Sequence, residues 1–490
     1  MGISLKMSLG VLGWLLTLRT EAATQKLTEK IVIDKLRNQS VVQKQEQAGS
    51  AQVQLTESLN QEKYQARAYT QYNFSRSSEK PLIVFNPVLS PSENWRAGVE
   101  KKVSYGVNLR AEVFGTQFTT QDQSFKNVTQ TGTRVGAEVD LWKNLFGKFD
   151  RADLKSLQSQ KERAKLQEEL NLKKQEMEFR KVYWSLVALQ QSIELSEGLV
   201  SSAEKQLADA SDRQRVGVAD KAEVARTKAL LESRKSSLLL FEYEKEKLLQ
   251  VFEKNFENFV SSDWALPVDE QRTALPLMQQ CIDKIQSQKT VDSKSTSLSQ
   301  ILMLLKNETE NEIKKAQLHA GPDLSLQAQY QTSGVSNSYE QARQDLDNRD
   351  RSGYALGVML SIPLGDTQSK SEKTLLTAKK NALEAQIQYL ENDIQSTHES
   401  MLKSLDLLNR GLKNQTDNAE NMKISFSEIQ KKYRQGRVPL TNLIFEQDSF
   451  FQSQLQVIEI QKQVALAVLD YFSVFNNFSC SWNRVNGDLK

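Results

Sequence analysis

Apolar residues recur at alternating steps of three and four along a stretch from about 150 to 213 that contains no proline. This spacing puts them on one face of a helix and predicts a heptad seam. The seam is formed by Val182, Leu186, Leu189, Ile193, Val200, Ala203, Leu207 and Ala210, with Ser196 at the position between Ile193 and Val200. A helix of about 60 residues would rise roughly 90 Å, which is far more than a helix of a compact domain.

This long helix is expected to end at Gly217, where a second striped helix begins. The same sequence of events returns later in the chain. A third apolar stripe runs from Leu376 to Leu412, the break comes at Gly436, and a fourth stripe follows it. Because the two glycines lie 219 residues apart, we predict an internal duplication of a long helical hairpin.

Strand-like alternation of apolar and polar residues precedes each predicted hairpin. The alternating runs lie at 107–113, 134–141, 324–331 and 354–362. Apolar residues on one face and polar residues on the other are typical of transmembrane barrel strands, although a soluble sheet with one wet face would fit any single strand equally well. The segment 74–105 holds three of the eight prolines, and whether it adds a strand pair stays open.

The N-terminus carries the pattern of a secretory signal peptide. Lys6 precedes the apolar run MSLGVLGWLLTL, and small residues around Ala22 suit cleavage near residue 23. No cysteine lies nearby, so a lipid anchor there is not expected. No later segment approaches 18 consecutive apolar residues, so no transmembrane helix is predicted. Four two-faced strands in an exported chain favour the membrane barrel over the soluble sheet.

The composition of the chain argues against several classes of function. The chain of 490 residues has 64 basic and 61 acidic residues, and a net charge of +3 predicts no nucleic-acid partner. His319 and His398 lack further ligands at metal spacing, and no nucleotide or catalytic motif is present, so we predict no metal, no cofactor and no enzyme activity. Cys281 and Cys480 could form a disulfide in an exported chain or remain free thiols.

Four sequence segments resemble landmarks of the TolC family of outer-membrane efflux and secretion channels. Two resemble the hairpin tips of that family, and two resemble its junctions between strand and helix. The segments are RQRVGVADKAEV (213–224), KYRQGRVPLTNL (432–443), GAEVDLWKNLFGKFDRADLKS (136–156) and GVMLSIPLGDTQSKSEK (357–373). Their order, repeated in two halves, extends the resemblance from about residue 24 to residue 475.

The resemblance implies a mainly α-helical fold with a β-barrel: long coiled-coil hairpins form a periplasmic tunnel, and transmembrane strands are completed by trimerisation. The expected order is a signal peptide (1–23), a first repeat (24–260), a linker or equatorial segment (261–293), a second repeat (294–475) and a tail (476–490). The first repeat would hold strands within 66–142 and a hairpin at 150–256 with its tip at 213–220. The second would hold strands at 322–333 and 352–363 and a hairpin at 369–475 with its tip at 432–440.

The function implied by the resemblance is a passive trimeric duct of a tripartite efflux or type I secretion system in the outer membrane. Its partners would be a periplasmic adaptor, an inner-membrane transporter of RND or ABC type, and outer-membrane lipid. Three chains with four strands each would close a barrel of twelve strands. The alternative is a periplasmic coiled-coil scaffold that forms no channel.

The resemblance also assigns roles to residues at both turns. The tips would contact the adaptor through Arg213, Arg215, Val216, Gly217, Val218, Arg434, Gly436 and Arg437. The closed entrance would lie just beyond the second tip, where family members often carry two acidic residues. Here those positions hold Asn442 and Phe445, with Glu446 one residue further on. We therefore expect a gate formed by Asn442, Phe445 and Glu446, and the alternative is that Phe445 only packs between the hairpins.

Overall fold

The computed structural model describes residues 25–77, 89–120, 127–257, 259–260, 264–267, 270–288, 290–347, 352–362, 367–475, 480 and 482. The predicted signal peptide and most of the predicted tail lie outside these residues. The chain divides into two compact units, which are described separately. The helical unit comprises the residues up to 44, 173–289 and those from 398 onward, and the sheet unit comprises 45–172 and 290–397.

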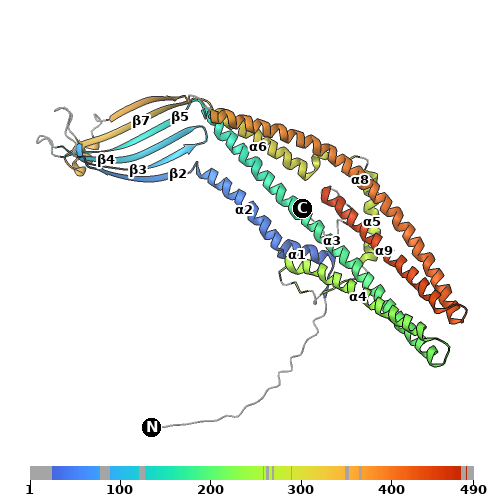
Figure 1. Ribbon diagram of the computed structural model, residues 1–490. Coiled ribbons are helices and arrows are strands. Elements are labelled where there is room, and N and C mark those ends of the chain that lie inside the picture. The colour runs from blue at the N-terminus through green and yellow to red at the C-terminus, as the bar shows by residue number, and fades with distance from the viewer. Residues whose placement is uncertain are drawn as a thin grey trace, which may run out of the picture. The chain divides into compact units, whose positions relative to one another are not determined.

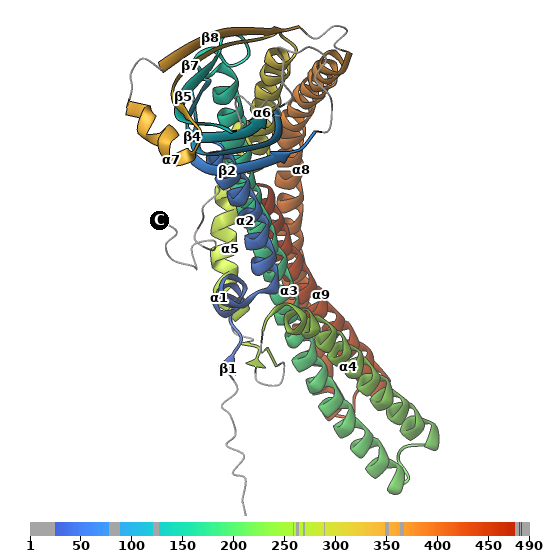
Figure 2. The same cartoon turned by 90° about the vertical axis from the view of Figure 1, so that its left-hand side faces the viewer.

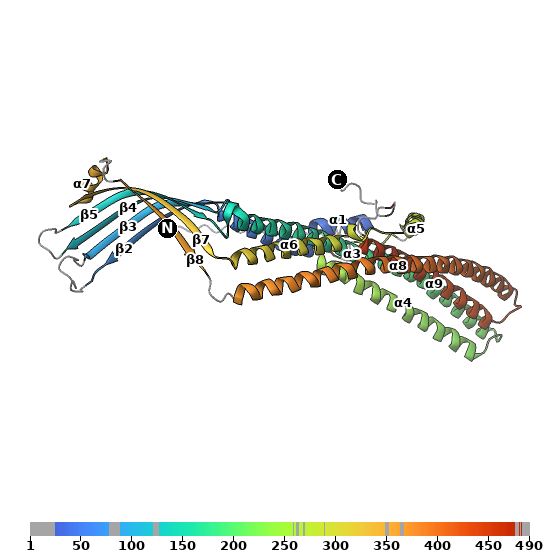
Figure 3. The same ribbon diagram turned by 90° about the horizontal axis from the view of Figure 1, so that it is seen from above.

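Six antiparallel strands form one sheet in the sheet unit (Figures 1 and 3). The strands are β2 (Ala66–Ser75), β3 (Leu89–Val103), β4 (Val107–Thr120), β5 (Val128–Asp140), β7 (Asp323–Ser336) and β8 (Ser352–Ser361). They lie in the order β2-β3-β4-β5-β7-β8, so β5 from the first half of the chain pairs with β7 from the second half. Within the described residues, β2 and β8 are the edges of this sheet.

The strand count corrects the expectation of four strands per chain. The additional pair is β2 and β3, which lies in the first half of the chain and includes most of the described part of the segment left open by the sequence. The alternation of apolar and polar residues is weak in this strand pair. In β2, the small residues Ala66 and Ala68 occupy positions where a strand usually carries large apolar side chains. Charged residues at Lys101 and Glu93 also interrupt the alternation along β3.

The two faces of the sheet differ in polarity across all six strands. One row of paired residues crosses the apolar face, namely Ala68, Val99, Ala111, Val135, Tyr330 and Tyr354. The adjacent row on the opposite face is Tyr69, Gly98, Glu112, Arg134, Gln331 and Gly353. On this polar face Glu112 accepts hydrogen bonds from Tyr69 Oη and Arg134 Nη1, both at 2.5 Å. Large side chains on the apolar face, such as Val135 and Tyr354, are exposed.

Helices of the sheet unit are tied together by ion pairs. They are α2 (Val41–Glu62), the first part of α3 (Lys148–Arg215), α6 (Ser297–His319) and the first part of α8 (Thr367–Arg434). Lys315 Nζ lies 2.7 Å from Asp153 Oδ1 and joins α6 to α3. Lys306 Nζ lies 2.9 Å from Glu384 Oε1 and joins α6 to α8. A short helix, α7 (Tyr339–Gln344), packs on β5 and β7 (Figure 2).

A tight turn connects β5 to α3. Phe146 and Gly147 of the 3₁₀ turn Leu145–Gly147 have positive φ angles of 52° and 71°. A Cβ atom on Gly147 would lie 2.1 Å from the carbonyl oxygen of Ser104, so both the angle and the close approach require glycine. This turn falls within the predicted junction of the first half.

The helical unit contains α1 (Glu29–Gln39), the later part of α3, α4 (Lys221–Asn255), α5 (Glu270–Ser287), the later part of α8 and α9 (Leu440–Val474). Helices α3 and α8 each have 68 residues, and α4 and α9 each have 35. The lengths of the two hairpins therefore match. A parallel pair of two-residue strands, β1 (Gln25–Lys26) and β6 (Trp264–Ala265), completes the unit.

The predicted seam on α3 lies on the buried side of the helix. Leu186, Ile193, Ala203 and Ala210 are buried, and the other predicted seam residues are half-buried. The buried face is wider than a coiled-coil seam, because Tyr183, Trp184, Val187 and Ala188 are also buried. A wider apolar face is expected where a helix packs on several neighbours instead of one.

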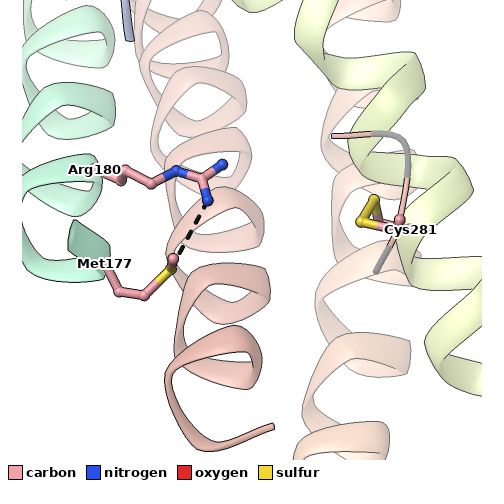
Figure 4. The surroundings of a disulfide bond; sticks show 4 residues. Met177, Arg180 and Cys281 are labelled. Atoms are coloured by element: carbon pink, nitrogen blue, oxygen red, sulfur yellow. Dashed lines mark hydrogen bonds between the residues drawn. A yellow bond between two sulfur atoms is a disulfide. The ribbon is translucent and has the colours of Figure 1, made fainter. Parts of the chain in front are cut away.

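A disulfide joins Cys281 of α5 to Cys480, with an Sγ–Sγ distance of 2.04 Å (Figure 4). Arg180 is labelled in the same view, where its guanidinium donates to Met177 Sδ at 3.8 Å. Arg180 also donates to Glu29 Oε1 at 2.6 Å and lies over the ring of Trp482, 4.9 Å from its centroid. These contacts fix residues 480 and 482 within the helical unit.

Among the described residues, no helix is both long and apolar enough to cross a membrane.

Candidate functional site at the hairpin tips

The turns at the two hairpin tips share one pair of backbone hydrogen bonds. Val218 N donates to Arg213 O at 2.8 Å, and Gly217 N donates to Gln214 O at 3.0 Å. At the second tip, Arg437 N donates to Lys432 O at 2.9 Å, and Gly436 N donates to Tyr433 O at 2.8 Å. These paired bonds define a Schellman motif, which satisfies carbonyl groups at a helix C-terminus.

Glycine is required in both turns by the backbone and not by crowding. The φ angles of Gly217 and Gly436 are 78° and 69°, in the left-handed region that side chains with a Cβ avoid. A Cβ atom built on either glycine would have no other atom within 4 Å. Both tips are therefore open to solvent, and each turn needs a residue that can adopt a positive φ angle.

The predicted contact residues lie on this open surface. Val216 and Val218 flank Gly217 and are 69% and 67% exposed. Arg215, Arg434 and Arg437 are also exposed, whereas Arg213 is half-buried. Arg213 thus differs from the other predicted tip residues in its lower exposure.

Beneath the tips, the two hairpins share one small core. Ala210 of α3 packs with Leu440 and Leu443 of α9, and all three are buried. Half-buried apolar side chains from α4, α8 and α9 surround these residues, namely Val224, Phe426, Ile429, Tyr433 and Ile444. The tips therefore lie side by side in the helical unit, on one packed support.

A polar network crosses from the first hairpin to the second just above the turns. Tyr433 Oη donates to Asp209 Oδ2 at 2.5 Å and accepts from Arg213 Nη1 at 3.2 Å. Arg213 Nη1 also lies 3.5 Å from Glu223 Oε1. Arg213 is therefore a link between α3, α4 and α8, which explains why it is less exposed than the other tip arginines.

The ionisation of this network follows from its contacts. Burial and the hydrogen bond to Asp209 raise the pKa of Tyr433, although Arg213 opposes the shift. The hydrogen bond to Tyr433, together with the nearby carboxylates of Glu223 and Asp209, raises the pKa of Arg213. At neutral pH the Tyr433 phenol is protonated and the Arg213 guanidinium is charged. The neutral phenol donates to the carboxylate of Asp209, and the cation of Arg213 lies beside the carboxylate of Glu223.

The predicted gate residues lie in the first two turns of α9. Asn442 and Phe445 are exposed, and Phe445 is 68% exposed. Phe445 therefore does not pack between the hairpins of its own chain. Glu446 is half-buried and accepts a hydrogen bond from Ser425 Oγ of α8 at 2.9 Å.

No family model matches the sequence, and no curated protein matches it. Several solved structures do match over nearly the whole chain, among them three outer-membrane proteins. They are the outer membrane protein VceC of Vibrio cholerae (12% identity, 91% of this chain and 96% of that chain, TM-score 0.63), the CmeC outer membrane channel of Campylobacter jejuni (12%, 96% and 94%, 0.61) and the open state of the MtrE outer membrane channel of Neisseria gonorrhoeae (11%, 91% and 88%, 0.58). The chain has the TolC-like channel fold. The resemblance inferred from the sequence and the predicted fold class are thereby confirmed at the level of fold.

Within this TolC-like fold, the sequence reasoning missed one part of the tip network. It named Arg213 as a contact residue but did not identify Asp209 or Tyr433, which hold it. The available signal was the aromatic residue three positions before Gly436, because a half-buried phenol beside a turn needs a hydrogen-bond partner. The partner could not be read from the sequence, since Asp209 lies 224 residues away.

A second missed cluster lies further along the TolC-like hairpins. Gln206 of α3 and Gln447 of α9 are both buried, and Gln206 Nε2 donates to Gln447 Oε1 at 2.8 Å. Gln447 Nε2 in turn donates to Ser202 Oγ at 2.7 Å. Polar residues at buried seam positions fix the register of paired helices, and here they set α3 against α9.

The tips also border a groove of about 860 Å³ between the two hairpins. It is lined by residues of α3, α8 and the second turn, including Lys205, Arg213, Arg434, Arg437 and Pro439. Four basic side chains around one opening give the groove a positive rim, and Asp209 is the acidic residue among its lining.

Proposed function

We propose that this chain is the outer-membrane channel of a tripartite efflux or type I secretion system and acts as a passive trimeric duct without catalytic activity of its own. The observation that carries the proposal is the two-faced sheet. Its apolar face is exposed over all six strands, as Val135, Tyr330 and Val358 illustrate, whereas its other face carries charged and amide side chains. A sheet with this pattern suits a wall between lipid and water.

The open edges of the sheet support assembly with further copies, which we propose to be a trimer. Each backbone group left unpaired in hydrocarbon carries a large penalty, so a spanning sheet must close on itself or on other copies. The likeness to VceC, CmeC and MtrE supports this arrangement through the fold. On this proposal the polar face lines a lumen and the apolar face contacts outer-membrane lipid.

The tips are proposed to dock a periplasmic adaptor, which connects the duct to an inner-membrane transporter of RND or ABC type. The support is the exposed pair Val216 and Val218 together with Arg215, Arg434 and Arg437. Apolar side chains ringed by arginines are a composition favoured in the centre and rim of protein interfaces. The first hairpin would contribute the valines, and both hairpins would contribute arginines to this surface.

The closed entrance is proposed to lie at the start of α9. Three copies of Phe445 that converge on the axis would form an apolar constriction, and Glu446 would add negative charge behind it. The exposure of Phe445 supports this role, because the described residues leave 68% of this residue open to contact with other copies. Asn442 lies one turn earlier on the exposed side of the same helix.

The test of the proposal is where the chain accumulates and in what form. Membranes from cells that express it should yield, after detergent extraction, a trimer that resists dissociation in mild detergent. Reconstituted trimer should conduct ions in planar bilayers. Recovery of the chain in the water-soluble periplasmic fraction without conductance would support a coiled-coil scaffold and reject the channel.

A further inference from the structure

We propose that the barrel of this protein has eighteen strands, closed by a ladder between β2 of one chain and β8 of the next copy. The inference rests on the proposed trimer and adds the identity of the strands that join the copies. It starts from the six strands of one sheet, each of 10 to 15 residues. Three chains would supply three times six strands, which lies within the range of transmembrane barrels.

The first observation is that β2 and β3 belong to the same wall as the other four strands. Strand β3 pairs with β4 over almost its whole length, from Val103 opposite Val107 to Ser92 opposite Phe118. That ladder occupies the edge of β4 that a four-strand wall would need for closure. The β4 edge is therefore not free to pair with a second copy.

The second observation is that the extra pair has the same two faces as the rest of the sheet. On the apolar side, Tyr72 and Phe74 of β2 and Val99 of β3 are exposed. Val99 lies in one row with Ala111 of β4 and Val135 of β5. On the polar side, Arg96 Nε donates to Gln71 Oε1 at 2.7 Å. A strand pair outside the membrane would have no reason to expose aromatic residues on that one side.

The third observation concerns direction and length. All neighbours in the sheet are antiparallel, and six is an even number, so β2 and β8 run in opposite directions. A β8 strand can therefore pair with β2 of the next copy in an antiparallel ladder that continues the pattern. Each of these edge strands has ten residues, so neither leaves a long unpaired overhang.

An eighteen-strand barrel changes the size of the duct at the membrane. Barrel diameter grows roughly in proportion to strand number, so this wall would be about half again as wide as one of twelve strands. Barrels of about 16–18 strands enclose an aqueous channel instead of a lumen filled by side chains. The polar face, with Arg96, Arg110 and Arg134 among its residues, would line that channel.

Disulfide crosslinking in membranes tests which strands meet. Both native cysteines are bonded to each other, so pairs of new cysteines can be introduced without competing native thiols. The variant Thr70→Cys on the apolar face of β2 is combined in turn with Tyr354→Cys, Leu356→Cys, Val358→Cys and Leu360→Cys on the same face of β8. The panel covers the possible registers, because the shift between copies is set only when the barrel closes.

At least one pair of this panel should convert most of the full-length chains into dimers and trimers that a reductant dissolves. The matched control, Thr70→Cys with Ala355→Cys, places the second cysteine on the polar face and should not crosslink. A second panel replaces Thr70→Cys by Leu109→Cys on β4 and should also fail.

The outcomes separate the strand count from the trimer. If the particle is trimeric by native mass and the Leu109→Cys panel crosslinks, the barrel is closed by β4 and the eighteen-strand inference is wrong. A trimer in which neither panel crosslinks also overturns the β2–β8 ladder. If the native mass is that of a single chain, the proposed trimer itself fails.

Discussion

The two halves of this chain agree in their helices and differ in their strands. The hairpins α3–α4 and α8–α9 have the same lengths, 68 and 35 residues, and their turns share one pair of backbone hydrogen bonds. The first half, however, supplies four strands of the large sheet, whereas the second supplies two. The difference shows that the hairpins are constrained as a matched pair, while a sheet tolerates an added hairpin as long as both faces keep their pattern.

The reason lies in how each element is stabilised. The two hairpins are set against each other by buried residues such as Gln206 of α3 and Gln447 of α9, so a change of length in one hairpin would shift these contacts. A strand pair added at a sheet edge repeats the existing ladder and disturbs no earlier pairing. The strand count can therefore change more easily than the hairpin.

The largest expected effect comes from a charge on the apolar face of either half. Leu109→Arg in the first half and Val358→Arg in the second should each cost about 2–4 kcal/mol per chain near the middle of the membrane, repeated in three chains. The yield of membrane trimer should fall strongly for both. The control Asn108→Arg lies on the opposite face and should leave the yield nearly unchanged. Normal yields for both apolar-face variants would contradict the proposal that strands from both halves form one lipid-facing wall.

Next in size is the loss of a tip. Gly217→Val and Gly436→Val each place a β-branched residue at positive φ, which costs about 1–3 kcal/mol locally. Trimers should form, while export should fail because the adaptor no longer docks. The control Gly198→Val also replaces a glycine in open space, but within a regular helix, and should export normally. If only one of the two tip variants loses export, the halves are not equivalent in docking.

The proposed entrance offers a further comparison of the two halves, because the predicted gate residues occur in the second half only. At the repeat offset of 219 residues, Asn442, Phe445 and Glu446 correspond to Glu223, Arg226 and Thr227. Phe445→Ala should raise the single-channel conductance of isolated trimers, and Glu446→Gln should weaken cation selectivity through the loss of three charges. Arg226→Ala is the control from the first half and should change neither. Unchanged conductance and selectivity in both α9 variants would place the constriction elsewhere.

The smallest expected effect concerns the N-terminal caps of the two returning helices, α4 and α9. Asp220 caps α4, and its side chain accepts from Glu223 N at 2.7 Å, whereas Pro439 at the start of α9 makes no such bond. Asp220→Ala should destabilise the first turn of α4 by about 0.5–2 kcal/mol. Faster hydrogen exchange of the Glu223 amide would report this loss, while export should persist. Pro439→Ala should leave exchange in the first turn of α9 nearly unchanged, and equal effects at both sites would contradict the difference in capping.

The sequence determined the elements that depend on local patterns. Heptad spacing predicted both hairpins, and the glycines at 217 and 436 marked their tips, because apolar periodicity and the need for positive φ are visible in neighbouring residues. Strong alternation identified β4, β5, β7 and β8. The pair β2 and β3 was left open because alanines and charges weakened its pattern.

Only the tertiary structure decided which distant residues meet. The link from Asp209 to Tyr433 and the pairing of Gln206 with Gln447 join residues more than 200 positions apart, and no local pattern encodes such a distance. The structure likewise joined Cys281 to Cys480, where the sequence allowed either a disulfide or two thiols. The strand count was also settled by pairing, since a weak strand is stabilised by the ladder on its neighbour and not by its own residues.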